Sequence, residues 1–255
     1  GMTMKKFGRV LLNILIPLCV FVLLLGFWEW MCVKNEIPEW LLPAPSKIFA
    51  CMVTEFSEFA PHIGISFITV LAGFGIAVPV GILLATLITA NKHVASALSP
   101  YIIVLVTTPL IILLPLLMLF LGYGIKVRII GVVLQAFAIV NMNTCTGILN
   151  VPEMRHELMQ SMGATKLQTL RTVIYPTAAQ DIFTGVRLGA IFATTACISA
   201  EFTGGNEGLG ALIISYSQYL KVTESFACIF YVMIIGLIMY GLVSLLQKKI
   251  VYWRT

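Results

Sequence analysis

The stretch that decides the fold lies at residues 157–176 and reads ELMQSMGATKLQTLRTVIYP. Two short helical patterns meet here, because Gly163 interrupts the first and glycine inside a helix costs about 1 kcal/mol relative to alanine. The second pattern covers 166–174 and is expected to end before Pro176, whose ring cannot continue a helix. Upstream, Pro152 marks the start of the first helix. We therefore predict two short helices at a bend, which form a docking element too small to be a catalytic domain.

Long apolar runs flank this stretch on both sides. Hydrophobic residues make up 59% of the 255-residue chain and charged residues 11%, whereas soluble domains carry about 25% charged residues. Six runs reach the length of about 20 residues that a helix needs to cross a bilayer, and none alternates with period two as barrel strands do. We therefore predict an all-α polytopic membrane protein, a single transmembrane domain over 1–255. Its expected spans are about 10–31, 63–90, 101–121, 127–149, 182–203 and 226–246.

The distribution of Lys and Arg predicts the orientation, because basic residues in short loops stay on the cytoplasmic side. With the N-terminus inside, eleven basic residues lie on the inner side and five on the outer side. We therefore predict that both termini are inside (N-in/C-in), and that the net charge of +5 reflects topology, not nucleic-acid binding. The inner group is Lys5, Lys6, Arg9, Lys92, Arg155, Lys166, Arg171, Arg187, Lys248, Lys249 and Arg254, and the outer group is Lys34, Lys47, Lys126, Arg128 and Lys221.

Two connections between the spans are long. The outer stretch 32–61 is expected to form an interfacial elbow, in which Ser46 caps an amphipathic helix over 47–59. The inner stretch 150–181 is the longest cytoplasmic segment and contains the two short helices.

The inner stretch resembles the permease subunits of ATP-binding cassette importers. Their cytoplasmic sequence is Glu-Ala-Ala, three residues, Gly, nine residues, Ile, one residue, Leu-Pro, and Glu157, Gly163 and Pro176 stand at the matching positions. Val173 replaces the isoleucine, Tyr175 replaces the leucine, and two other apolar residues replace the alanines. The segment also lies between the fourth and fifth predicted spans, where that family has its coupling helix.

The resemblance extends over nearly the whole chain and narrows to the branch that serves nitrate, taurine, alkanesulfonates and thiamine-pyrimidine precursors. It rests on short motifs in the elbow, in the second, third and fifth spans and in the loops after the third and fifth. These motifs are WLLPAPS at 40–46, AGFG at 72–75, PVG at 79–81, PL at 109–110 and 115–116, GYG at 122–124, NT at 143–144, FTGVRL at 183–188, AEF at 200–202 and GLG at 208–210.

The resemblance implies a type I importer permease fold in the bacterial cytoplasmic (inner) membrane. It implies a homodimer that forms the pathway for a small solute, with a sulfonate-, taurine- or nitrate-like anion first among the candidates. A substrate-binding protein is expected to dock outside, and a dimer of ATP-binding cassette ATPases inside. The residues implied to couple this chain to the ATPase are Glu157, Ser161, Gly163, Ala164, Thr165 and Pro176.

The sequence lacks the motifs of several enzyme classes. No G-x-x-x-x-G-K-[ST] is present to hold a nucleotide phosphate, and neither H-E-x-x-H nor G-x-S-x-G occurs. The six cysteines are scattered without metal-ligand spacing. We therefore expect no enzyme activity, no metal and no cofactor in this chain, with ATP and Mg²⁺ bound by the partner ATPase.

Polar residues inside the predicted spans are candidates for the substrate pathway, because such groups either bond neighbouring helices or line a pathway. We predict that Gln135 and Asn141 line the route, with interhelical hydrogen bonding as the alternative. Arg187 has a structural role or contacts substrate, and Glu201 acts in packing or gating or contacts a ligand. The full candidate set is Gln135, Asn141, Asn143, Thr144, Arg187 and Glu201.

Small residues recur at spacings of three and four in the fifth predicted span, at Gly185, Gly189, Ala193 and Ala196. Such a pattern lets two backbones approach closely. Packing within the subunit is the favoured interpretation, and a dimer interface is the alternative.

Three other functions are compatible with a chain of this type. The same importer type could carry a thiamine-pyrimidine or another neutral heterocyclic precursor. A membrane assembly factor or sensor that does not transport could use the same inner helices to bind its partners. An ion channel is the third, but the sequence has no ring of acidic residues and no re-entrant filter motif.

Overall fold

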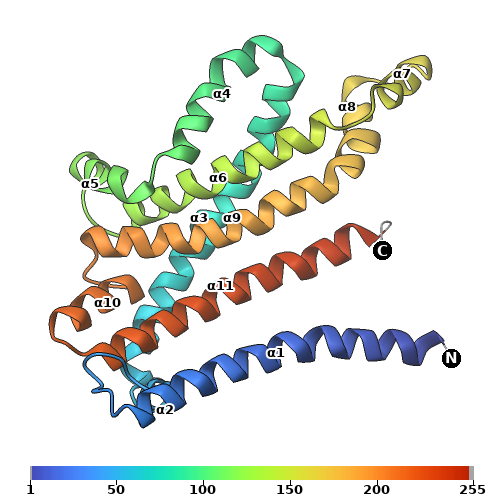
Figure 1. Ribbon diagram of the computed structural model, residues 1–255. Coiled ribbons are helices and arrows are strands. Elements are labelled where there is room, and N and C mark those ends of the chain that lie inside the picture. Colours follow the sequence, from blue (N-terminus) through green and yellow to red (C-terminus); the bar gives the residue numbers. More distant parts are fainter. Residues whose placement is uncertain (1, 253–255) are drawn as a thin grey trace. The chain divides into compact units, whose positions relative to one another are not determined.

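Helices form all the regular structure in the part of the chain that the computed structural model describes, which is residues 2–252 for the backbone and 15–252 for side chains. Arg254 and the side chains of Lys5, Lys6 and Arg9, all counted above in the inner group, lie outside these residues. The helices are α1 (Met2–Lys34), α2 (Pro45–Thr54), α3 (Phe56–Ala90), α4 (Lys92–Thr107), α5 (Leu110–Leu121), α6 (Ile125–Leu149), α7 (Glu153–Ser161), α8 (Lys166–Thr169), a π-helical turn η1 (Leu170–Ile174), α9 (Tyr175–Gly204), α10 (Leu209–Gln218) and α11 (Val222–Ile250) (Figure 1).

Five segments of the described chain are long and apolar enough to cross a membrane, and a bent pair of helices raises the number to six if it counts as one span. The five are Leu15–Lys34, Phe56–Ala90, Ile125–Leu149, Lys166–Gly204 and Val222–Ile250.

The bent pair is α4 and α5, which meet at an angle of 106° where a straight span was predicted over 101–121. Thr108 has φ −83° and ψ 119°, which is extended backbone. Pro109 causes this, because a proline ring excludes helical geometry from the residue before it. The third span is therefore broken, and its first half begins earlier than predicted, at Lys92.

The chain divides into two compact units. The first contains the residues up to Phe59 together with Ile213–Ile229. Within it, the Glu29 carboxylate accepts hydrogen bonds from the Ser46 backbone N–H at 2.9 Å and the Ser46 hydroxyl at 2.7 Å.

The prediction that Ser46 caps a helix over 47–59 is wrong, because α2 begins at Pro45 with Ala44 as its N-cap, and ends at Thr54. Proline in the first turn costs no helical hydrogen bond, because a backbone N–H at that position has no partner within the helix.

The second unit contains Ala60–Leu212 and the residues from Phe230 on. Its centre is the pair α6 and α9, which run side by side (Figure 1). Glycine permits this approach: a Cβ on Gly185 would lie 2.5 Å from the Cβ of Asn143, and one on Gly189 would lie 2.8 Å from Val140 Cγ2. The small residues of α9 therefore pack within the subunit, as the favoured interpretation of the sequence predicted.

Candidate functional site

The 150–181 segment contains two short helices joined by a bend at Gly163, as the sequence predicted. The N–H of Gly163 donates to the carbonyl of Gln160 at 2.9 Å, and the N–H of Ala164 donates to the carbonyl of Met159 at 3.0 Å. This pair of bonds is a Schellman motif, which ends a helix through a residue in the left-handed region. Gly163 has φ +71°, so glycine is the residue that this turn favours.

The second short helix begins at once, with Thr165 as its N-cap. The Thr165 hydroxyl accepts the N–H of Gln168 at 3.3 Å, and the Gln168 side chain accepts the N–H of Thr165 at 2.7 Å. This reciprocal pair is a capping box. Backbone and capping bonds therefore fix the bend from both sides.

Pro176 does not end the second helix, and that prediction is wrong. It lies in the first turn of α9, directly after the π-helical turn η1. The N–H of Tyr175 donates to the carbonyl of Leu170, five residues back. The wider turn carries the chain past a proline that has no N–H to donate. The short helix therefore runs on into the long apolar helix α9.

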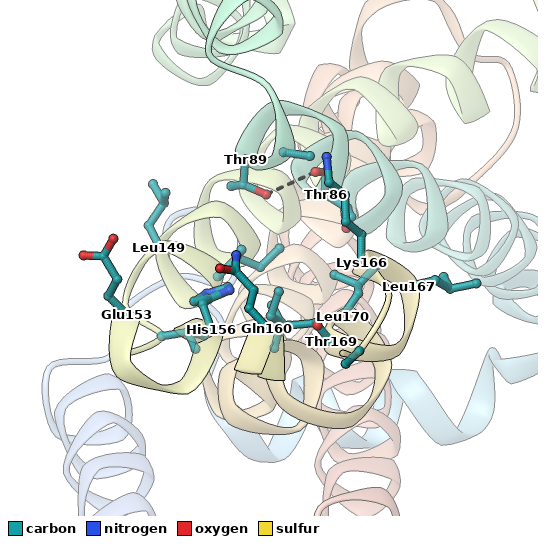
Figure 2. Close-up of a pocket in the computed structure, with 15 residues that line it drawn as sticks. Thr86, Thr89, Leu149, Glu153, His156, Gln160, Lys166, Leu167, Thr169 and Leu170 are labelled. Atoms are coloured by element: carbon teal, nitrogen blue, oxygen red, sulfur yellow. Dashed lines mark hydrogen bonds between the residues drawn. The ribbon is translucent and has the colours of Figure 1, made fainter. Parts of the chain in front are cut away.

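The polarity of the two faces of α7 is the reverse of that in an ordinary surface helix, because its apolar face is exposed and its polar face lines a pocket. Met154, Leu158 and Met162 lie on one face at spacings of four, and their exposed fractions are 75%, 59% and 73%. The polar residues Glu153, His156 and Gln160 lie on the opposite face and line a pocket (Figure 2). Exposed apolar patches occur at protein–protein and membrane interaction sites and in ligand-binding grooves.

The pocket behind α7 has a volume of about 820 Å³. Thr86 and Thr89, at the end of α3, form its wall opposite α7, and Lys166 lies on the α8 side (Figure 2). The Thr86 hydroxyl is 2.8 Å from the hydroxyl of Tyr175, which ties α3 to the start of α9. Apolar residues complete the lining, among them Ile148, Leu149, Leu167, Leu170 and Ile174. The pocket thus separates the knob formed by α7 and α8 from the end of α3.

The residues matched to the coupling sequence are all in or next to this knob. Glu157 is exposed on α7, and the Ser161 hydroxyl donates to the carbonyl of Leu158 at 2.8 Å in the last turn. Ala164 is half-buried, lies in the bend and lines the pocket. Sequence reasoning missed the exposed apolar stripe, although the spacing of Met154, Leu158 and Met162 was visible in the sequence.

The four pathway candidates on α6 divide into a buried and a half-buried pair. Asn141 is buried, and its side-chain amide donates to the carbonyl of Gly81 on α3 at 3.1 Å. Thr144 is also buried, and its hydroxyl has no hydrogen-bond partner among the described residues. Gln135 and Asn143 are half-buried, and the Asn143 amide donates to the carbonyl of Ile139 in its own helix. The contact of Asn141 favours interhelical bonding over pathway lining for that residue.

One face of α9 stays open and carries polar groups. Thr184, Arg187, Ile191 and Thr195 follow one another at spacings of three and four and are half-buried or exposed. The Arg187 guanidinium donates to the hydroxyl of Thr184 at 3.4 Å. Sequence reasoning identified Arg187 but missed the two threonines, which have no distinctive local pattern.

Glu201 lies at the other end of α9, away from the 150–181 segment, with an exposed fraction of 1%. Its carboxylate accepts hydrogen bonds from the Ser66 hydroxyl at 2.7 Å and from the Gly210 N–H at 2.8 Å. This places Glu201 within the packing of the second unit. Sequence reasoning missed its partner Ser66, which lies 135 residues away in the sequence.

The cysteines are free in the structure. In the first unit, burial raises the pKa of the Cys51 thiol to about 12, and the nearby Glu55 carboxylate adds to the shift. The thiol is therefore protonated near neutral pH and a poor nucleophile. Among the described residues no group of three or more His, Cys, Asp or Glu side chains could hold a metal ion.

Comparison with known proteins identifies the fold and the family. A family model described as "Binding-protein-dependent transport system inner membrane component" matches residues 77–252. The formylaminopyrimidine transport permease protein ThiX of Halalkalibacterium halodurans is 28% identical over 240 residues, which cover 93% of this chain and 95% of ThiX. The taurine transport system permease protein TauC of Escherichia coli is 26% identical over 238 residues, covering 91% and 86% of the two chains. Among solved structures, a chain of an amino acid ABC transporter is similar in fold, with a TM-score of 0.63, 21% identity and coverage of 79% of this chain and 98% of that one.

Proposed function

Because the chain belongs to the family of binding-protein-dependent transport system inner membrane components, a family of multi-pass permeases, we propose that two copies of it form the translocation pathway of an ATP-driven importer. In this proposal a substrate-binding protein delivers the solute from outside, and a pair of ATPase subunits docks inside. ATP and Mg²⁺ are bound by those subunits, and this chain binds neither.

The observation that carries the proposal is the exposed apolar stripe on α7. Met154, Leu158 and Met162 are exposed on a short helix that also carries charged and polar side chains. An apolar stripe on a short helix fits a groove on another protein, where its burial is favourable. The Schellman turn at Gly163 and the capping box at Thr165 hold this helix rigidly, which a coupling element needs in order to transmit movement.

The test is co-purification of the ATPase with variants of α7. Leu158→Glu places a charge in the centre of the stripe, and burial of an unpaired charge is strongly unfavourable. We expect this variant to lose the ATPase while the permease itself remains monodisperse. His156→Ala, on the opposite face of the same helix, is the matched control and keeps the ATPase. Equal recovery with both variants would contradict docking through this stripe.

The open polar face of α9 supports a route along that helix. Thr184, Arg187 and Thr195 line it, and Gln135 and Asn143 are half-buried candidates on the neighbouring helix α6. A polar face in an apolar span avoids lipid, because unsatisfied polar groups are costly there. In the proposed dimer this face points to the shared pathway.

A small organic anion such as a sulfonate is the proposed substrate class. Arg187 is half-buried, and its guanidinium donates to the Thr184 hydroxyl. Among the described residues it has no acidic ion-pair partner within 4 Å. A cation on a low-dielectric wall attracts anions. A neutral pyrimidine is the second candidate, because ThiX is similar over 93% of this chain.

Two measurements separate these substrates. The binding protein is titrated with taurine, with an alkanesulfonate and with formylaminopyrimidine, and uptake is compared between wild type and Arg187→Gln. For an anion we expect uptake to fall about tenfold or more, the range of one lost charge-assisted contact. For a neutral pyrimidine the variant should transport normally, which would contradict a substrate contact by Arg187.

A further inference from the structure

The end of α9 opposite the 150–181 segment contains a buried polar cluster that joins three helices. We call it the Glu201 cluster, and it contains Glu201 on α9, Ser66 and His62 on α3, Arg128 on α6 and the backbone N–H groups of residues 208–210. The Glu201 side chain is fully buried and the Arg128 side chain is 5% exposed. A buried ion pair needs further hydrogen bonds to offset its desolvation. Here Glu201 has several, whereas the Arg128 Nε has none among the described residues.

The loop after α9 is shaped around the Glu201 carboxylate. Three successive N–H groups point at side chains: Gly208 donates to His62 Nδ1 at 3.0 Å, Leu209 to Ser66 Oγ at 2.9 Å, and Gly210 to Glu201 Oε2 at 2.8 Å. Gly208 has φ +100°, and a Cβ at Gly208 would collide with the carboxylate of Glu201. The first turn of α10 is thus capped by side chains of α3 and α9, where an acidic group is favourable.

Arg128 links this loop to α6. Its Nη1 donates to the carbonyl of Glu207 at 2.9 Å and lies 4.0 Å from Glu201 Oε1. Its Nη2 lies 3.7 Å from the carboxylate of Glu207, whose side chain is 63% exposed. The chain of contacts therefore runs from an acidic group on the surface, through a buried cation, to a buried carboxylate.

We propose that Glu201 and Arg128 are positioning residues that fix the 205–210 loop to α3 and α6. A partner that binds at the loop surface would then displace the loop, α3 and α6 as one unit. The proposal rests on the importer function argued above. The predicted orientation puts this loop outside, on the side where the binding protein docks. Because Glu207 is exposed and also held by Arg128, docking at Glu207 acts directly on the buried pair.

The first experiment measures hydrogen exchange in the 205–212 segment of the purified permease in lipid nanodiscs, without partners. Glu201→Ala removes the acceptor of the Gly210 N–H, and we expect exchange there to accelerate about tenfold or more, since protection reflects local opening. Glu201→Gln keeps one acceptor oxygen and should give a smaller increase. Thr203→Ala is the matched control, because its hydroxyl bonds only the Ser199 carbonyl of its own helix.

The second experiment measures ATP hydrolysis by the assembled transporter, with and without the substrate-loaded binding protein. Glu201→Gln and Ser66→Ala are both expected to lose at least about tenfold of the stimulation, as a coupling defect would, and Ser66→Ala is expected to keep the basal rate within about twofold. Ser66→Ala leaves the Glu201–Arg128 pair intact. Loss of stimulation in this variant therefore cannot be attributed to misfolding caused by removal of the buried charge.

The outcomes distinguish this proposal from the importer function itself. Unchanged exchange in Glu201→Ala would overturn the fixed loop. Faster exchange with undiminished stimulation would overturn the positioning role. If wild-type permease recruits no ATPase, the importer function fails while the exchange result still decides whether the loop is fixed.

Discussion

The knob formed by α7 and α8 and the Glu201 cluster lie at opposite ends of α9. Each contains a turn at a glycine, and the two turns are stabilised in different ways. At the knob, Gly163 is exposed, and a Cβ there would meet nothing within 4 Å. Backbone and capping bonds within the segment define that turn. In the Glu201 cluster, Gly210 is buried, and a Cβ would lie 2.7 Å from the Cβ of Glu201. The first turn is determined locally and leaves its surface free for a partner, whereas the second depends on side chains from distant helices.

The largest effect on stability is expected for Gly210→Ala. The added methyl group would also lie 2.9 Å from the carbonyl of Ile198, so α9 and α10 must move apart. Overpacking of this kind costs about 1–3 kcal/mol. The measurement is the temperature at which half of the protein stays monodisperse after heating, and we expect a clear decrease. Stability equal to wild type would mean that the loop has room to move and is not tightly packed.

Gly163→Val should separate stability from function at the knob. Valine at φ +71° is strained by roughly 1–2 kcal/mol, so the bend rearranges, but no buried contact is lost. We therefore expect nearly normal thermal stability together with the loss of substrate-stimulated ATP hydrolysis and of uptake. Gly163→Asn is the control, because asparagine tolerates left-handed backbone. Wild-type uptake in the valine variant would count heavily against coupling through this bend.

This contrast also explains which features the sequence could predict. The helical class, the bend at Gly163 and the approximate position of most apolar helices follow from local patterns of hydrophobicity, glycine and proline. The break at Pro109 could also have been predicted locally, because proline restricts the backbone of the residue before it. A single span was predicted over 101–121 because the apolar run there is long enough to cross a membrane. Pro176 shows the limit of a local rule, because the same residue can follow the end of one helix or begin the next.

The environment of Glu201 could not be predicted from local patterns. Its partner Ser66 lies 135 residues away in the sequence, and Arg128, which was used in the sequence analysis only to count charges, is buried near it. A buried ion pair depends on which helices pack together, and the spacing of neighbouring residues does not contain that information.

Thr165→Ala tests how far capping alone fixes the knob. The variant loses the hydroxyl that accepts the Gln168 N–H, and loss of an N-cap costs about 1 kcal/mol. Because the knob is built from local bonds, we expect faster hydrogen exchange confined to 165–170, with exchange at 205–212 unchanged. Thr165→Ser keeps the cap and should behave as wild type. Spread of the effect to 205–212 would show that the two ends of α9 are energetically coupled.

The smallest effect on stability is expected midway between the two ends, at Asn141. Its bond to the Gly81 carbonyl joins α6 to α3, and interhelical bonds of this kind contribute about 0.6 kcal/mol on average in a membrane protein. If Asn141 only packs, Asn141→Ala lowers thermal stability slightly and leaves uptake and stimulated ATP hydrolysis unchanged, whereas Gln135→Ala, at a half-buried position, reduces uptake. If both variants leave transport unchanged, the predicted route past α6 is wrong and the pathway follows the polar face of α9 alone. If Asn141→Ala abolishes uptake without lowering stability, the buried bond to Gly81 opens during transport, and α6 and α3 must separate in the cycle.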